Sequence, residues 1–247
     1  MPSVPQNIYH DIRPIGPSGS FLVSHPTGTA GIAHTEWMRL SPSRLGTDLA
    51  ITSVTPNNSA ALVGSAITNP IFYITYTGSP SGATITSTAT GTQDIADPFT
   101  AHQWFDTFPT GLPNSSRLFT VTASGEFNTT SASTRIYYLQ KMYWGVGATG
   151  TYDTAFIISL GNSALSSGHN IEFTASPSAT QYIFYAFRAA AGQALFTDKA
   201  SNMRGGFTLD GSGITFTNTA GYAEAYNVWR SDYPGLSTST IIVGSGV

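Results

Sequence analysis

The 247-residue sequence contains no cysteine and little charge. The absence of cysteine excludes disulfide bonds, thiolate catalysis and cysteine-ligated zinc. Only 9% of the residues are Asp, Glu, Lys or Arg, and the formal net charge at pH 7 is -3. Nucleic-acid binding needs a basic stripe that neutralises phosphates. Because no basic residues cluster in this chain, we expect no nucleic-acid partner.

Long apolar runs and known catalytic motifs are missing as well. No run approaches the ~20 apolar residues that a membrane-spanning helix requires, and the N-terminus lacks the charged and apolar regions of a secretory signal. The sequence has no G-x-S-x-G motif, no Walker phosphate loop and no histidine pair spaced i, i+4. We therefore predict no membrane insertion, no enzymatic activity, no catalytic or metal-binding residues and no cofactor.

Residues that favour β-strands dominate what is present. Thr, Ser, Tyr, Val and Ile are abundant, whereas the Glu and Lys residues of solvated helices are scarce. The 12 Tyr, 14 Phe and 4 Trp residues supply the apolar area of a folded core. We predict an all-β fold in three parts: an extended N-terminal arm, an immunoglobulin-like β-sandwich, and a second β-rich sandwich module with one short helix.

The predicted arm covers residues 1–47. Its many prolines and glycines disfavour a long helix or a central strand, although residues 33–39 have the length of one short turn of helix. Large apolar residues scattered through the arm need a surface that covers them, and we predict that they dock on a neighbouring subunit or on the modules that follow. These residues are Tyr9, Ile12, Phe21, Trp37 and Met38.

The first predicted module covers residues 48–139, where apolar and polar residues alternate with a period of two. In one run, Phe72, Ile74 and Tyr76 fall on one face of a strand. Short strands of this kind recur between turn-forming residues, which is the pattern of an immunoglobulin-like sandwich, here without a cysteine pair. The clearest expected strands are residues 49–54, 70–77, 83–88, 117–123 and 131–139.

A long segment, residues 93–113, interrupts this alternation. Its aromatic residues leave two interpretations open: they form an exposed platform for sugar rings, or they close one end of the sandwich. The candidate contacts with surface glycans are His102, Trp104, Phe105 and Phe108.

The same segment contains three aspartates close to His102. Carboxylates grouped on one loop can bind calcium through their oxygen atoms, but the spacing of Asp94, Asp97 and Asp106 matches no EF-hand or repeat motif. The alternative is that the aspartates begin Asx turns, as the proline after Asp97 indicates. We favour the turns.

The second predicted module covers residues 140–247 and begins with the aromatic stretch 141–147. We interpret Trp144 as packing that seals the cores of the two modules together, because buried aromatic residues mostly contribute apolar area. The run 181–188 is apolar on both faces, so we expect it to form a central strand.

The only helix of two or more turns that the pattern supports covers residues 152–165. Phe156, Ile157 and Leu160 would share one of its faces. Asp153 or Thr151 is placed to cap its N-terminus.

Four fragments of the second module form an ordered set: Tyr143-Trp-Gly-Val-Gly147, Gln181-Tyr-Ile-Phe-Tyr-Ala-Phe187, Ile214-Thr-Phe-Thr-Asn-Thr-Ala-Gly-Tyr222 and Tyr226-Asn-Val-Trp-Arg-Ser231. This set resembles a domain of tailed-bacteriophage structural proteins. Together with the sandwich that precedes it, the resemblance covers about residues 48–247.

The resemblance implies a non-enzymatic structural component of a bacteriophage virion, assembled in the host cytoplasm. Its partners would be other virion proteins, further copies of the chain, with a trimer favoured, and host-surface polysaccharide. The arm and the aromatic content of residues 93–113 fall outside the resemblance, so the position of the chain on the particle stays open.

Two virion roles follow. The chain is a tail-fibre, baseplate or other surface appendage whose loops face the host, or it is a capsid decoration (cement) protein whose arm stabilises the head. We favour the appendage, because an arm followed by immunoglobulin-like modules is frequent in such parts. A glycan-processing enzyme is a third class, supported only by the permissiveness of the fold.

Overall fold

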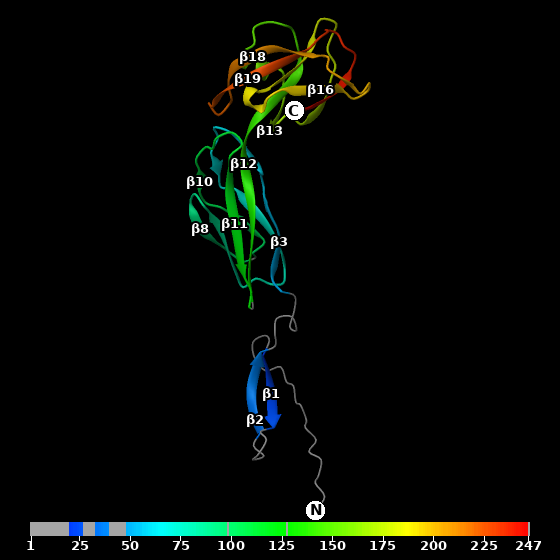
Figure 1. Cartoon of the computed structure of the whole chain (residues 1–247). Helices are drawn as coiled ribbons and strands as arrows, with labels where there is room; N and C mark the ends of the chain where they lie inside the picture. The colour runs from blue at the N-terminus through cyan, green and yellow to red at the C-terminus, as the bar shows by residue number, and fades with distance from the viewer. Residues whose placement is uncertain (1–19, 27–32, 40–47, 98, 127, 247) are drawn as a thin grey trace, which may run out of the picture.

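The computed structural model confirms the all-β fold (Figure 1). In the part of the chain that is described, the only helical segments are one short α-helix, α2 (Thr154–Ser159), and one 3-10 turn, η1 (Ala189–Ala191). The residues described are 20–26, 33–39, 48–97, 99–126 and 128–246.

The N-terminal part contains a β-hairpin. Strands β1 (Ser20–Pro26) and β2 (Ala33–Arg39) pair antiparallel, from Ser20 opposite Arg39 to Pro26 opposite Ala33. The predicted helical turn over residues 33–39 is therefore wrong. An isolated helix of seven residues is unstable, because nucleation is costly, whereas pairing with β1 satisfies the backbone groups of these residues.

Three of the five predicted docking residues of the arm lie in this hairpin, and two lie outside the described residues. Phe21 lies opposite Met38 in the hairpin, and Trp37 lies opposite Leu22. Tyr9 and Ile12 lie outside the described residues. Docking of the arm on another subunit stays a prediction.

The first module is a sandwich of two sheets, as the alternation predicts. One sheet has the order β3-β6-β9, and the facing sheet has the order β12-β11-β7-β8, with β4 also on β12 and the short pair β5-β10 beside it. The strands are β3 (Ala50–Pro56), β4 (Ala60–Leu62), β5 (Ile67–Thr68), β6 (Ile71–Thr77), β7 (Gly82–Ser87), β8 (Gly91–Ile95), β9 (Ala101–Gln103), β10 (Thr107–Phe108), β11 (Ser116–Ser124) and β12 (Thr129–Gly147).

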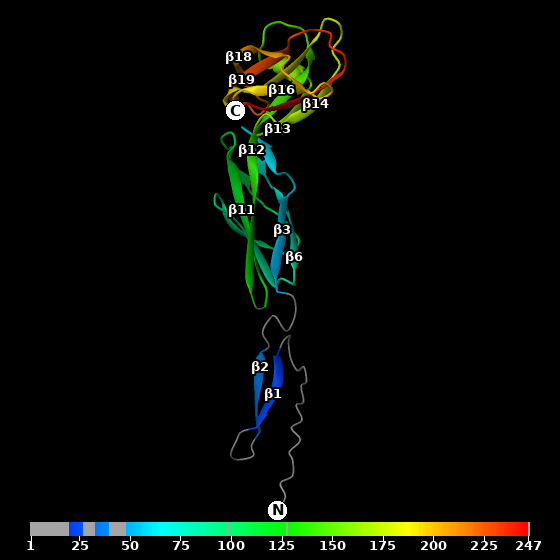
Figure 2. The same ribbon diagram turned by 45° about the vertical axis from the view of Figure 1, so that its right-hand side comes forward.

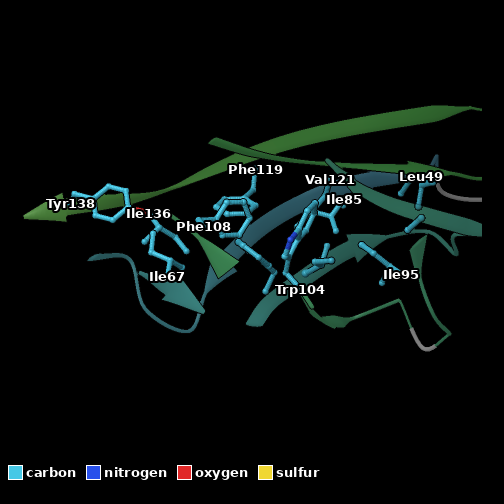
Figure 3. Packing of buried hydrophobic residues seen from close by; sticks show 14 of the residues in the cluster. Leu49, Ile67, Ile85, Ile95, Trp104, Phe108, Phe119, Val121, Ile136 and Tyr138 are labelled. Carbon is cyan, nitrogen blue, oxygen red and sulfur yellow. The ribbon is translucent and has the colours of Figure 1, made fainter. Parts of the chain in front are cut away.

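A single hydrophobic core fills the space between these sheets (Figure 3). In β6, the side chains of Phe72 and Ile74 are buried while Tyr73 between them is 53% exposed. Tyr76 packs against the same core. The predicted face of this strand is confirmed, because a period of two places alternate side chains on opposite sides of a sheet.

One strand, β12 (Thr129–Gly147), belongs to both modules. Its first part pairs antiparallel with β11, and its residues 137–139 pair parallel with β4. From Gln140 onward it pairs with strands of the second module. The boundary predicted between residues 139 and 140 thus falls inside a continuous 19-residue strand, at the point where its partners change. The two views in Figures 1 and 2 show the modules end to end along this strand.

The second module has two facing sheets. One sheet continues the first module through β12 with the order β18-β19-β15-β12 and carries β13 on β12; the other has the order β14-β20-β16-β17. The strands are β13 (Asn162–Ser166), β14 (Ile171–Ala175), β15 (Tyr182–Arg188), β16 (Ala194–Asp198), β17 (Met203–Arg204), β18 (Phe207–Thr217), β19 (Ala223–Ser231) and β20 (Ser239–Ser245).

Strand β15 is buried on both faces, as its sequence predicts. Ile183, Tyr185 and Phe187 belong to the core between the sheets. Phe184 and Ala186 belong to a second core on the other face, which includes Ile157 and Leu160 at the helix α2. The second module therefore has three layers, whereas the first has two.

The helix is shorter than predicted. Asp153 caps it, because its Oδ1 accepts a hydrogen bond from the backbone N–H of Phe156 at 2.8 Å. The chain leaves the helix at Gly161, whose φ of +82° suits glycine. Residues 162–166 then pair with β12 as strand β13 instead of continuing the helix.

Candidate functional sites in the modules and at their junction

Two of the predicted glycan contacts are buried in the first module. Trp104 and Phe108 are both 0% exposed. Their rings lie 5.7 Å apart, and Phe108 lies edge-on to Phe119 at 5.1 Å (Figure 3). The prediction that these two residues contact surface glycans is wrong. The alternative holds for them: strands β9 and β10 within the segment pair with β6 and β5, which draws both rings into the core.

The other two predicted glycan contacts, Phe105 and His102, are not buried. The side chain of Phe105 is 71% exposed, and the two rings meet edge to face at 6.5 Å. His102 Nε2 lies 3.1 Å from Oε1 of Gln93, which also accepts a hydrogen bond from the backbone N–H of Phe105. Burial lowers the pKa of His102, so the ring is neutral at pH 7. A glycan contact here would involve the exposed ring of Phe105 and a histidine that is already hydrogen-bonded to Gln93.

The carboxylates of residues 93–113 do not form a metal site with His102. Across the described ranges, no group of three His, Asp or Glu side chains is arranged to hold a metal ion. Asp106 Oδ1 accepts a hydrogen bond from the backbone N–H of Thr107. This bond goes to the next residue, whereas an Asx turn bonds to the residue two positions on, so the Asx turns stay a prediction.

A buried polar cluster connects the two modules. Asn218, which is 4% exposed, follows β18 in the second module, and its Nδ2 donates a 2.7 Å hydrogen bond to the carbonyl oxygen of Val63 in the first. The same Nδ2 lies 3.3 Å from Oε1 of Gln140, which is 0% exposed and belongs to β12. Buried polar groups are costly unless they are paired. This pairing therefore favours one relative position of the modules.

The cluster continues into an ion pair within the second module. Gln140 Nε2 donates a 3.0 Å hydrogen bond to Oε2 of Glu224, and Glu224 Oε1 lies 3.0 Å from a guanidinium nitrogen of Arg188. The two charged side chains are only 14% and 11% exposed. Their mutual attraction offsets part of the cost of removing each charge from water. The pair thus holds the Glu224 carboxylate where Gln140 can donate to it.

The backbones of the two modules also approach closely. Gly64 has φ of +92°, and a Cβ atom at this position would lie 2.8 Å from the Cβ of Tyr222. Tyr222 comes from the second module and packs against the core of the first. Asn218 Oδ1 fixes the turn that carries Tyr222, because it accepts a hydrogen bond from the Tyr222 backbone N–H at 3.1 Å. No side chain larger than that of glycine fits between the modules here.

His169 is a structural histidine beside the core that lies between the two sheets of the second module. It is 0% exposed, its Nε2 lies 3.1 Å from the carbonyl oxygen of Gly192, and its Nδ1 lies 3.0 Å from the hydroxyl of Tyr185. A carbonyl accepts only, so Nε2 carries the proton and Nδ1 accepts from the tyrosine. Burial lowers the pKa of His169 and raises that of Tyr185, so both stay neutral at pH 7.

Trp144 packs within the second module. Its ring stacks on Phe173 with centroids 5.8 Å apart and an angle of 28° between the planes. It belongs to the margin of the core between the two sheets of that module, and the core of the first module ends at Tyr138. The packing interpretation is right, but the predicted seal between the two cores is formed by the polar cluster and Tyr222 instead.

Sequence reasoning missed the junction residues. Gln140 stands in an apolar strand, and Asn218 begins an Asn-Thr-Ala-Gly turn. A polar residue in an apolar strand and an asparagine at the start of a turn only weakly indicate a buried polar contact. Gln140 and Asn218 lie 78 residues apart in the sequence, so no local pattern links them.

Comparison with known proteins assigns no family. No family model and no curated protein matches the chain. Within the residues described, no helix has the length and apolar character needed to cross a membrane.

Proposed function

We propose that this chain is a non-enzymatic structural component of a bacteriophage virion, in the form of a surface appendage of the tail-fibre or baseplate type. Its N-terminal segment would bind other virion proteins, and its two modules would form a rigid rod that projects from the particle. The observation that carries this proposal is the sharing of β12 between both modules.

A shared strand makes a stiff spacer. Modules joined by an ordinary linker move relative to each other by default. Here nineteen residues of continuous strand, at ~3.3–3.4 Å per residue, correspond to roughly 60 Å without a flexible joint. Any hinge at Gln140 would also break the buried contacts with Asn218 and Glu224. Such stiffness suits a part that holds a distal surface at a fixed distance.

The resemblance of residues 48–247 to phage structural proteins supports the same proposal. It brings further expectations: a homo-oligomer, with a trimer favoured, other virion proteins as partners, and contact with host-surface polysaccharide. The chain would be located in the virion. Light scattering of the purified chain tests the oligomer, and a monomer that persists at high concentration would contradict the trimer.

The virion assignment is tested on particles. Particles banded from a lysate of the phage that encodes the chain are washed in high salt and probed with an antibody raised against the purified protein. We expect the chain to band with the particles and gold-labelled antibody to decorate the tail. A chain found only in the soluble fraction would refute the proposal.

The same labelling separates the appendage from a decoration protein, for which gold would cover the head. A chain that lacks residues 1–45 serves as the companion variant. In an appendage, this deletion removes the chain from otherwise stable particles. In a decoration protein, it also lowers the resistance of the shell to heat and salt.

A further inference from the structure

A hollow opens at one edge of the second module. Its volume is about 330 Å³, and it lies between the two sheets, where β12 and β13 face the end of β14. Its wall includes Trp144 from β12 and the residues at the end of α2. Small-ligand sites on proteins occupy on the order of 300–1,000 Å³ and are lined by aromatic groups with a few polar atoms. The hollow is therefore at the lower end of the size range for a small ligand.

The aromatic part of the wall is held firmly. Trp144 is half-buried, and stacking on Phe173 fixes the plane of its indole ring. Beside it, the end of α2 approaches the β12 backbone so closely that a Cβ atom at Gly145 would lie 2.0 Å from the carbonyl oxygen of Leu160. A rigid aromatic surface loses little entropy when it binds a ligand. The indole ring is thus a preformed surface.

The polar part of the wall carries no charge. It contains exposed hydroxyl groups and one exposed carboxamide, contributed by Ser159, Asn162, Thr174 and Ser176. Hydrogen bonds to neighbouring hydroxyl groups keep two of these groups in place. The Thr174 hydroxyl lies 2.9 Å from that of Thr240, and the Ser176 hydroxyl lies 2.8 Å from that of Thr238. Hydroxyl groups both donate and accept hydrogen bonds.

This combination matches one class of ligand. A sugar ring presents C–H groups on a face, which pack on an indole ring, and hydroxyls around its edge, which bond to hydroxyl and amide groups. A charged ligand would lose hydration here without gaining an ionic partner. We propose that the hollow binds a neutral sugar residue of a larger glycan, with the ring stacked on Trp144.

The inference sharpens the proposed contact with host polysaccharide and rests on that function only for the source of the glycan. It also moves the contact away from residues 93–113, where Trp104 and Phe108 are buried. The site itself is defined by Trp144 and the neutral rim around it.

The first experiment uses the purified full-length chain, labelled with 5-fluorotryptophan. An array of neutral and acidic oligosaccharides, built from hexoses, N-acetylhexosamines and uronic acids, identifies ligands, which are then titrated while 19F spectra are recorded. Of the four tryptophans, we expect the resonance of Trp144 to shift and that of the core residue Trp104 to stay unchanged. The resonance of Trp144 is the one absent from a Trp144→Leu variant.

Variants locate the site independently. Trp144→Leu is expected to weaken binding at least tenfold, as expected when an aromatic anchor is removed. Thr174→Val keeps the shape of an exposed strand residue, removes one rim hydroxyl, and is expected to weaken binding several-fold. Thr120→Val is the matched control, because Thr120 forms the same kind of hydroxyl pair with Ser133 in the first module. Phe105→Ala tests the site expected from the sequence.

The outcomes are distinct. A shifted Trp144 resonance, with loss of binding in both hollow variants and normal binding in both others, supports the proposal. Binding that survives Thr174→Val without shifting Trp144, binding lost in Phe105→Ala alone, exclusive binding of acidic glycans, or no binding to the array would each overturn it. If Trp144→Leu fails to fold, Trp144→Phe, which keeps an aromatic ring, assigns the Trp144 resonance instead, and the spectra together with the Thr174→Val variant still decide. Particle banding stays a separate result, so either proposal can fail alone.

Discussion

The two modules use aromatic residues differently, although both are built on the same long sheet. In the first module, one core lies between two sheets, and rings from the 93–113 segment enter it. In the second, β15 places Tyr185 on one face and Phe184 on the other, and each face has its own core. The second module requires α2 as a third layer to cover the outer core. The number of buried faces on a central strand therefore decides the number of layers.

The largest expected effect comes from the core that the helix covers. Phe184→Ala removes a ring that lies 5.0 Å from Phe156 and 5.9 Å from Tyr152. We expect the free energy of unfolding to fall by about 3–5 kcal/mol, because a large cavity is left in a close-packed core. Urea denaturation followed by tryptophan fluorescence measures the change.

The exposed Phe105 is the control for this substitution. Phe105→Ala should alter the free energy of unfolding by less than ~0.5 kcal/mol, because its ring is largely in water. Equal losses for the two variants would contradict the three-layer description of the second module.

A smaller loss is expected where the modules meet. Gly64→Ala combines an unfavourable positive φ with a clash against Tyr222, and we expect it to cost about 2–4 kcal/mol. Gly91→Ala is a matched control, since Gly91 has φ of +93° and nothing within 4 Å of the added Cβ. The difference between the two variants measures the steric contact at the junction alone. Identical effects would show that the modules separate easily.

The buried amide at the junction comes next. Asn218→Ala leaves the Val63 carbonyl oxygen without its 2.7 Å donor, so we expect a loss of about 1–3 kcal/mol. Hydrogen exchange should then report faster opening around residues 63–65 and 218–222 than in the core of either module. Unchanged exchange at these amides would refute a rigid junction.

The smallest expected effect depends on pH and again separates the modules. Burial lowers the folded pKa of His169 and His102 below the unfolded value of about 6.5. The folded state then binds fewer protons than the unfolded state, so stability is complete above that value and falls as the pH drops below it. His169→Gln should reduce this acid sensitivity more than His102→Gln, because His169 is fully buried. Unfolding curves measured at pH 7.5 and 5.5 test the order.

Much of the fold could be predicted from local patterns. The alternation over residues 70–77 gave strand β6 and its buried face, and the doubly apolar run at 181–188 gave the central strand β15. Asp153 was recognisable as a helix cap. These features depend on neighbouring residues, whose spacing along the chain matches the period of the structure they form.

The candidate sites could not be predicted in the same way. The aromatic residues of the 93–113 segment looked alike, but only Phe105 is strongly exposed, because pairing of β10 with β5 buries Phe108. The hollow beside Trp144 needs the ends of α2, β13 and β14 to meet. Such meetings are long-range events, which propensity and periodicity do not report.

The sequence by itself determined the strand-rich composition, the alternation of the first module, and a second module with a central strand buried on both faces. Only the tertiary structure decided that one strand would serve both modules and that Asn218, Gln140 and Val63 would meet in a buried junction. The physical reason is that the position of a residue within the repeat of its strand or helix decides which face its side chain lies on. What covers that face depends on partners far away in the chain.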